Sequence, residues 1–133
     1  MAIAFAQVSI HSRSKGHSAV AAAAYRSGAQ LYDDRIGRTY DFSKRDDVVF
    51  SEILLPDDAT ESFLDRDYLW NEVERAENRS NSQLCKDFVL ALPRELNLVQ
   101  QIELAKRFAR THFVERGVPA DISIHDHGNG NGN

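Results

Sequence analysis

The sequence predicts an α+β fold in which an antiparallel β-sheet is covered by α-helices. Apolar residues alternate with period 2 in some segments and recur with helical period in others along the 133 residues. Few of these segments have the spacing of a βαβ unit, which favours antiparallel over parallel strands. The length and the 42% hydrophobic content suit one soluble domain with a core of its own.

The first half of the chain predicts two strands around an alanine-rich helix. Residues 2–10 form a strand that is apolar on both faces at its start, as in the centre of a sheet. Residues 17–31 form the helix, and residues 31–42 form a short hairpin with turn residues in its middle. A second strand spans residues 48–55 and ends at Pro56.

The second half predicts two further helices and two strands. An amphipathic helix covers residues 66–78, and a strand covers residues 87–92. Asn97 and Gln100 form a capping box that begins a long helix, and Gly117 ends it. The final strand runs over residues 120–127, and the Gly/Asn tail at 128–133 is expected to be flexible.

Cysteine usage and the N-terminus indicate a cytoplasmic protein. Cys85 is the single cysteine, so no intrachain disulfide can form and a reducing compartment is expected. The apolar N-terminal stretch is short and has no basic residues before it, unlike a signal peptide. It is also too short to span a membrane.

Charge is distributed unevenly along the chain. The net charge is −4, which by itself argues weakly against a nucleic-acid partner. The first 32 residues, however, carry Arg13, Lys15 and Arg26 and no acidic residue. Because phosphate binding responds to local potential, these three bases are candidate DNA phosphate contacts. The alternative, that they serve solubility only, stays open.

Tyr25 is the first candidate catalytic residue. It lies on the alanine-rich helix, where helical spacing places His17, Ala21, Tyr25 and Gly28 on one face. Alanine side chains bury little surface, so a large partner can approach this face closely. A tyrosine nucleophile needs a metal or cations to help it, because the phenol is a weak acid. The alternative is that Tyr25 is a packing anchor.

The final strand carries the second chemical feature. Alternation places Ile122 and Ile124 toward the core and puts His125 and His127 together on the opposite face. Two imidazoles at this spacing can reach one metal ion, and Asp126 is a candidate for the second coordination shell. The alternative is a solvated histidine pair, because two ligands are too few for tight binding.

Several blocks of the sequence resemble the MobA/MobL group of plasmid mobilisation relaxases, which belong to the HUH endonucleases. The blocks follow the family's order and spacing over essentially the whole chain. They are MAIAFAQVSIHSRSKGHSAVAAAAYRSG, GRTYDFS, SEILLP, LWNEVERAENRSNSQL, FVLALPREL and DISIHDH.

The resemblance implies a function and roles for several residues. Tyr25 matches the family's nucleophile, which attacks one DNA strand at a plasmid transfer origin and becomes linked to the 5′ phosphate. His125 matches a ligand of the family's divalent metal, Mg or Mn. The implied partners are single-stranded DNA, the conjugation coupling protein and the secretion machinery. Glu74 and Glu77 are candidates for a base or a second-shell group, although acids on an amphipathic helix more often form its solvated face.

One departure from the family concerns the end of the chain. The family continues into a Pro-His-x-His segment on a further strand, whereas this sequence reads Asn129-Gly-Asn131-Gly-Asn133. We therefore expect residues 1–133 to form a nicking domain that is incomplete at its C-terminus and lacks its last central strand. Metal binding by this chain is expected to be weak or absent. A non-cleaving single-stranded DNA-binding module and an inactive relaxase remnant remain alternatives, so whether the chain is an enzyme stays open.

Overall fold

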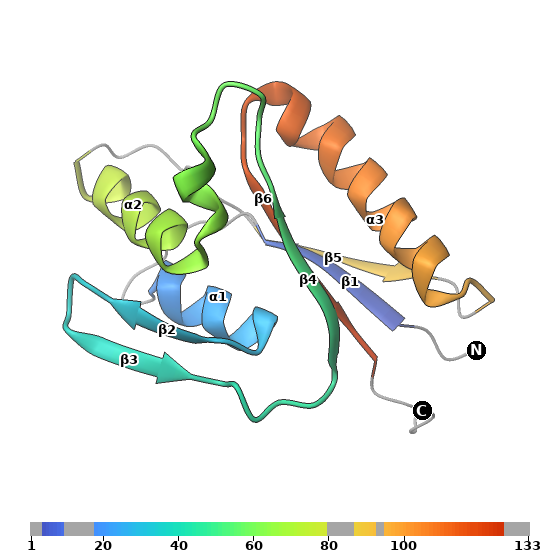
Figure 1. The fold of residues 1–133 in the computed structure, drawn as a ribbon, viewed down its shortest axis with the longest axis horizontal. Coiled ribbons are helices and arrows are strands. Elements are labelled where there is room, and N and C mark those ends of the chain that lie inside the picture. Colours follow the sequence, from blue (N-terminus) through green and yellow to red (C-terminus); the bar gives the residue numbers. More distant parts are fainter. Residues whose placement is uncertain (1–3, 10–17, 80–86, 93–94, 127–133) are drawn as a thin grey trace.

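The computed structural model describes residues 4–9, 18–79, 87–92 and 95–126. Figure 1 shows the helices and strands in chain order. The strands are β1 (Ala4–Ser9), β2 (Gln30–Asp33), β3 (Arg38–Asp41), β4 (Val48–Leu54), β5 (Asp87–Leu92) and β6 (Ala120–His125). The helices are α1 (Ala19–Ser27), α2 (Arg66–Arg79) and α3 (Leu98–His112), with short 3₁₀ turns at Glu61–Leu64 and Val114–Arg116.

Four of these strands form one antiparallel sheet in the order β4-β6-β1-β5. β2 and β3 form a separate antiparallel hairpin. The α+β prediction with an antiparallel sheet is therefore confirmed. β1 pairs with β5 on one side and β6 on the other, which agrees with the apolar pattern of the first strand.

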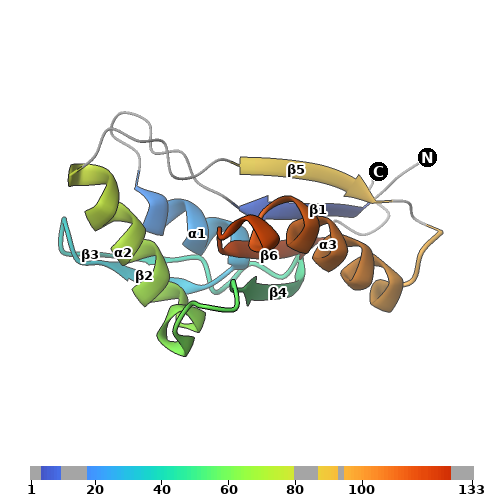
Figure 2. The ribbon, with the colours of Figure 1, turned by 90° about the horizontal axis from the view of Figure 1, so that it is seen from above.

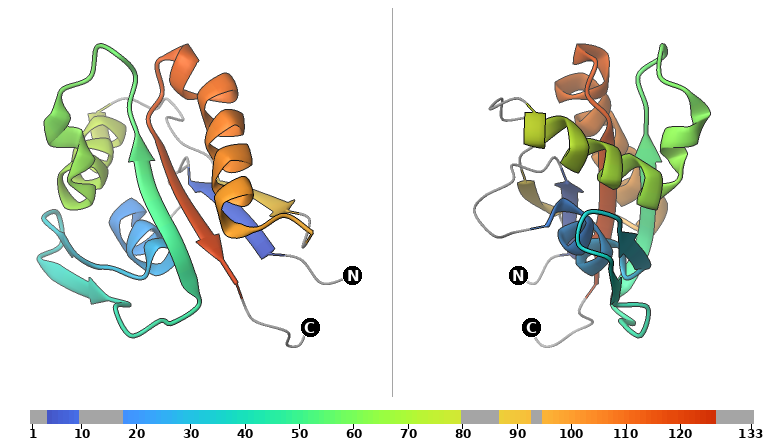
Figure 3. Two further views of the ribbon diagram at one scale, coloured as in Figure 1. Left: turned by 45° about the vertical axis from the view of Figure 1, so that its right-hand side comes forward. Right: turned by 90° about the vertical axis from the view of Figure 1, so that its left-hand side faces the viewer.

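Helices cover the sheet on both faces. α3 lies along one face, and α1 lies on the other with α2 and the β2–β3 hairpin beyond it (Figures 1 and 3). Figure 2 shows α1, α2 and the hairpin grouped at one side of the molecule, away from α3 and β5. Both faces of β6 are consequently inside the protein, and all six of its residues are buried. The sequence predicts that only one face of this strand, with Ile122 and Ile124, points to the core, but the face with His125 is buried as well.

The alanine-rich helix is shorter than predicted. The sequence predicts residues 17–31, but α1 ends at Ser27 because Gly28 adopts a left-handed conformation with φ of 67°. Leu31 then begins the buried side of the hairpin. On the inner side of α1, Val20, Ala23 and Ala24 pack into the core, so small side chains here allow the helix to lie close to the sheet.

Other boundaries follow the sequence prediction closely. α3 begins with the expected capping box, in which the Asn97 and Gln100 side chains each bond the other residue's backbone N–H. α2 and β5 start and end within one residue of the predicted bounds. The predicted tail at 128–133 lies outside the described residues. None of the helices in the described ranges has the length and apolar character that a membrane span needs.

Candidate active site

Tyr25 lies in the last turn of α1 with 52% of its surface exposed. Its ring meets the Phe42 ring edge to face, with centroids 5.2 Å apart and an interplanar angle of 88°. The Arg45 guanidinium stands over the same ring, 4.5 Å from its centroid. The phenol is thus accessible to a large partner, while its ring is held by an aromatic edge and a cation.

Arg45 is itself held by Asp47, two residues further along the segment that leads into β4. Its Nε and Nη2 atoms donate to the two Asp47 carboxylate oxygens at 2.9 and 2.7 Å. The third bond, from Nη1, goes to the backbone carbonyl of Tyr25 at 2.7 Å. The hydrogen bonds from Arg45 keep the pKa of the Asp47 carboxyl below its ordinary value, against partial burial, and the electrostatic interaction with His125 acts in the same direction.

His125, the last residue of β6, is buried beside the same end of α1. Its Nε2 atom lies 2.7 Å from the carbonyl oxygen of Arg26. A carbonyl can only accept, so Nε2 donates, and in the neutral ring the lone pair is on Nδ1. The bond places the predicted metal ligand next to the residue that follows the predicted nucleophile, although 100 positions separate Tyr25 from His125 in the sequence.

The strand register explains why these residues meet. β4 and β6 pair antiparallel with Val48 opposite His125, and the Asp126 N–H donates to the Asp47 carbonyl at 2.8 Å. Gly28 brings the end of α1 against Val48, at the beginning of β4. A Cβ added at Gly28 would lie 3.2 Å from Val48 Cγ2, tighter than ordinary contact. The beginning of β4, the end of β6 and the end of α1 therefore form one cluster, hereafter the Tyr25 cluster: Tyr25, Arg45, Asp47 and His125.

Two other predicted residues lie at the cluster. Arg26 is partly buried in the last turn of α1, where a positive charge suits the helix dipole. Asp126 is exposed directly after His125. Arg13, Lys15 and His127 lie outside the described residues, so their predicted roles are not tested by this structure.

Sequence comparison assigns the family. A sequence profile described as MobA/MobL family matches residues 17–133. The chain belongs to the MobA/MobL family. Among similar proteins, a conjugal transfer protein TraA of Agrobacterium fabrum is 38% identical over 95% of this chain. A mobilization protein MobL of Acidithiobacillus ferridurans is 39% identical over 86% of it.

A solved structure also resembles this member of the MobA/MobL family. It is described as "Molecular Basis of Vancomycin Resistance Transfer in Staphylococcus aureus" and matches with a TM-score of 0.68 at 30% identity. The match covers 96% of this chain and 72% of that one. The two curated relatives are much longer, because the matched region spans only 12% of TraA and 29% of MobL.

Glu74 is buried, although the pattern of acidic residues on its helix predicts an exposed side chain. The pattern predicts the solvated face of α2, but Glu74 is 1% exposed. Its carboxylate accepts from the backbone N–H of Ala19 and lies 3.5 Å from the Arg35 Nε. This position is the N-terminal end of α1, about 9 Å along the helix axis from Tyr25 at 1.5 Å per residue. The structure therefore does not bring Glu74 to the Tyr25 cluster, and the side chain of Glu77 lies outside the described part.

The described residues supply fewer metal ligands than the predicted metal site needs. No group of three or more His, Cys, Asp or Glu side chains that could hold a metal occurs within residues 4–9, 18–79, 87–92 and 95–126. Catalytic metal sites usually take three protein ligands. The described donors at the Tyr25 cluster consequently do not fit a complete catalytic site for this family.

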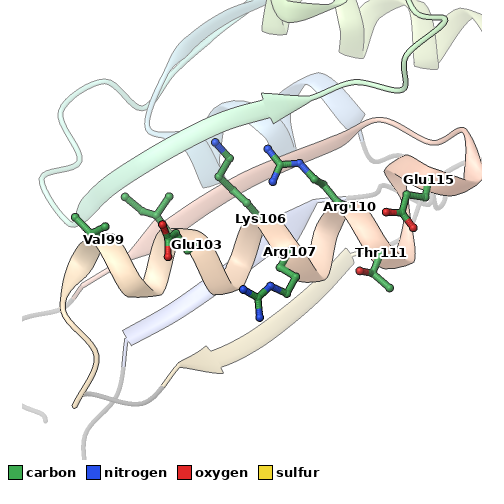
Figure 4. A pocket seen from close by; sticks show the side chains of 8 residues that line it. Val99, Glu103, Lys106, Arg107, Arg110, Thr111 and Glu115 are labelled. Atoms are coloured by element: carbon green, nitrogen blue, oxygen red, sulfur yellow. The ribbon is translucent and has the colours of Figure 1, made fainter.

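A groove of about 630 Å³ runs along the outer face of α3. Figure 4 shows Lys106 and Arg110 extending from α3 on the side of β4, with Arg107 on the opposite side. Lys106 is paired with Glu52 of β4 at 3.1 Å. This groove lies on the sheet face away from α1, so it is separate from the Tyr25 cluster (Figure 3).

The sequence analysis did not single out Arg45 or Asp47. They belong to the charged run Lys44-Arg45-Asp46-Asp47, which is typical of a solvated loop. The signal that could have indicated a role is the position of this run, between the hairpin and a strand expected to lie in the main sheet. Nothing in the sequence pairs Arg45 with a tyrosine 20 residues earlier.

Proposed function

We propose that this chain is the DNA-nicking part of a conjugative mobilisation protein, with Tyr25 as its nucleophile. The single observation that carries the proposal is the hydrogen bond from His125 to the Arg26 carbonyl beside an exposed Tyr25. The bond places His125, at the end of β6, beside the residue that follows Tyr25. Membership of the MobA/MobL family and the names of the relatives, which concern conjugal transfer and mobilization, support the same function.

The reaction would be a transesterification at one phosphodiester of the transfer origin. The Tyr25 phenol oxygen attacks phosphorus and forms a new O–P bond, while the bond from phosphorus to the 3′ oxygen breaks. The phenol proton passes to a base or to water, and the departing 3′ oxygen takes up a proton. The product is a 5′ phosphate linked to Tyr25 and a free 3′ hydroxyl. Because no hydrolysis occurs, the linkage keeps the DNA end attached for later rejoining.

The surroundings of Tyr25 suit this step. Tyr25 is half exposed at the end of a helix made mostly of alanine, so a DNA backbone can reach the phenol. Arg26 lies next to the nucleophile, and Arg13 and Lys15 precede the helix in sequence, so all three are proposed phosphate contacts. His125 remains the proposed metal ligand, with Asp126 next to it in the sequence. Weak divalent metal binding by this chain, the coupling protein and the secretion machinery stay predictions from the family resemblance.

The direct test measures adduct formation by a C-terminally extended version of the protein and by tyrosine variants of that version. The version extended through a Pro-His-x-His segment should nick a single-stranded oligonucleotide from its transfer origin and stay attached to the 5′ end. Tyr25→Phe removes only the hydroxyl and should abolish the adduct without changing the thermal unfolding midpoint. Tyr32→Phe, at a tyrosine with 47% exposure on the hairpin, is the matched control and should keep full adduct yield.

Two outcomes would overturn this assignment. Adduct formed by the Tyr25→Phe variant would exclude Tyr25 as the nucleophile. Specific binding of the oligonucleotide by the extended protein with no adduct under any divalent metal would instead favour the non-cleaving DNA-binding module. The adduct is measured by its shifted mobility in a denaturing gel.

A further inference from the structure

An exposed tyrosine on an alanine-rich helix has few neighbours to fix its side chain. Free rotation about the side-chain bonds would spread the phenol oxygen over several positions. A nucleophile reacts efficiently only when it is held close to the attacked atom in the correct direction. The neighbours of α1 on the outer side must therefore supply the orientation that alanine cannot.

Arg45 contacts Tyr25 at both its backbone and its ring. Nη1 donates to the Tyr25 carbonyl at 2.7 Å, while the guanidinium carbon lies 4.5 Å from the ring centroid. Because one rigid planar group contacts both parts of the same residue, the ring is fixed relative to its own backbone. The carbonyl belongs to the last turn of α1, where such groups lack helical partners and attract cations.

Asp47 fixes Arg45 in turn. The carboxylate receives two parallel hydrogen bonds, from Nε at 2.9 Å and from Nη2 at 2.7 Å, a geometry that lysine cannot reproduce. The backbone of Asp47 is tied to the sheet by the bond from Asp126. The Phe42 ring, in a T-shaped contact with the Tyr25 ring, also limits its movement. The chain of contacts therefore runs from the main sheet through Asp47 and Arg45 to the phenol ring.

We propose that Arg45, held by Asp47, is a positioning residue that sets the direction of the Tyr25 phenol for attack. Three of the five guanidinium N–H groups are engaged by Asp47 and the Tyr25 carbonyl, so most of its hydrogen bonds hold it against the nucleophile. This inference rests on the proposed function for its catalytic meaning. Its structural part concerns only the orientation of one side chain.

The first measurement is independent of nicking. Nuclear magnetic resonance of the whole 133-residue chain gives the α–β proton coupling constants of Tyr25, assigned with the Tyr25→Phe variant. The wild-type chain should show the couplings of a single rotamer. Arg45→Gln and Asp47→Asn should both move them toward the average of several rotamers, and Arg45→Lys should fall between. Arg75→Gln is the matched control, because Arg75 also bonds a carboxylate but lies on α2, and it should leave Tyr25 unchanged.

The second measurement separates rate from binding in the nicking-competent extended protein. Arg45→Gln should lower the single-turnover rate of adduct formation by about 10- to 100-fold, the range expected for a misplaced nucleophile. The dissociation constant for the oligonucleotide should stay within about twofold of wild type, since no phosphate contact is lost. Arg45→Lys should recover only part of the rate.

The two measurements fail in different ways. Unchanged Tyr25 couplings in Arg45→Gln would overturn the positioning role, whatever the enzymatic result. Weaker oligonucleotide binding with an unchanged single-turnover rate would also overturn it, and would make Arg45 a phosphate contact. Failure of the wild-type extended protein to form any adduct would overturn the proposed function, while the coupling constants would still decide whether Arg45 orients Tyr25.

Discussion

The two ends of α1 differ in how they are built. At the N-terminal end, the Ser18 hydroxyl caps the helix and donates to Asp33 at 2.6 Å, and Asp33 and Glu74 are almost fully buried. At the C-terminal end, Tyr25 is half exposed and contacts the partly buried Arg45. One end of the helix is thus closed by buried carboxylates, and the other presents an aromatic side chain to solvent.

This difference shows how a helix made mostly of alanine can be held in place. Alanine side chains bury little apolar surface, so the core contacts of α1 contribute less than those of a leucine-rich helix. Negative groups at the N-terminal end stabilise the helix through its free N–H groups and dipole. The structural role is therefore concentrated at one end, which leaves the other free for chemistry. Each variant below changes residues at one end of α1, so its effect should be limited to the contacts of that end.

Glu74→Ala should have the largest effect on stability. It removes the acceptor of the Ala19 N–H and the partner of Arg35, so the free energy of unfolding should fall by about 2–3 kcal/mol. Urea unfolding measures the change. Glu72→Ala, on the same helix in an exposed pair with Arg75, is the control and should change stability by less than about 0.5 kcal/mol. Loss of nicking by Glu74→Ala with unchanged stability would contradict the comparison and make Glu74 catalytic.

Gly28→Ala should have a smaller effect, at the open end. The left-handed backbone at φ of 67° and the close approach to Val48 Cγ2 should together cost about 1–2 kcal/mol. Gly117 is the matched control, because its φ is also positive at 87° but a Cβ there would meet nothing within 4 Å. Urea unfolding measures both glycine variants, and Gly117→Ala should cost about 1 kcal/mol. Equal losses at both glycines would show that the contact with Val48 does not hold the end of α1.

Charge reversal should produce the smallest effect on stability and should act mainly on DNA binding. Arg26→Glu, Arg13→Glu and Lys15→Glu should each reduce the salt dependence of single-stranded DNA binding by about 0.7 in log–log slope. Arg107→Glu and Arg116→Glu, on α3 and in the turn after it, should matter less. Fluorescence anisotropy at several salt concentrations gives the slopes. Equal losses from both groups would mean that the DNA path does not follow the Tyr25 end of α1.

The fold could be predicted from the sequence where its signals are local. The capping box of Asn97 and Gln100 lies within one turn, and it predicts the start of α3 correctly. The end of α1 was predicted wrongly at residue 31, because Gly28 ends the helix and helical propensity alone does not reveal a left-handed residue. The antiparallel sheet follows from the alternating segments, whereas burial of both faces of β6 also depends on α1, which lies about 100 residues earlier in the sequence.

The site could be predicted only in part. Tyr25 and His125 stand out because their residue types and neighbours are unusual, and the structure brings His125 against the Arg26 carbonyl, next to Tyr25. Glu74 and Asp47 carry ordinary patterns of charge, since each has other charged residues nearby in sequence. Their partners, Ala19 for Glu74 and the β6 end for Asp47, lie 55 or more residues away. Contacts over such distances depend on the packing of the whole chain and leave no periodic signal.

Mapping the residue that carries the DNA tests the central claim most directly. Trypsin cleaves after Lys15 and Arg26, so Tyr25 lies in the peptide 16–26, Tyr32 in 27–35, Tyr40 in 39–44 and Tyr68 in 67–75. The adduct of the nicking-competent extended protein is digested with nuclease and trypsin, and its peptides are sequenced by mass spectrometry. We predict a nucleotide attached to the peptide 16–26 at Tyr25. Attachment to any of the other three peptides would contradict the assignment of Tyr25 as the nucleophile.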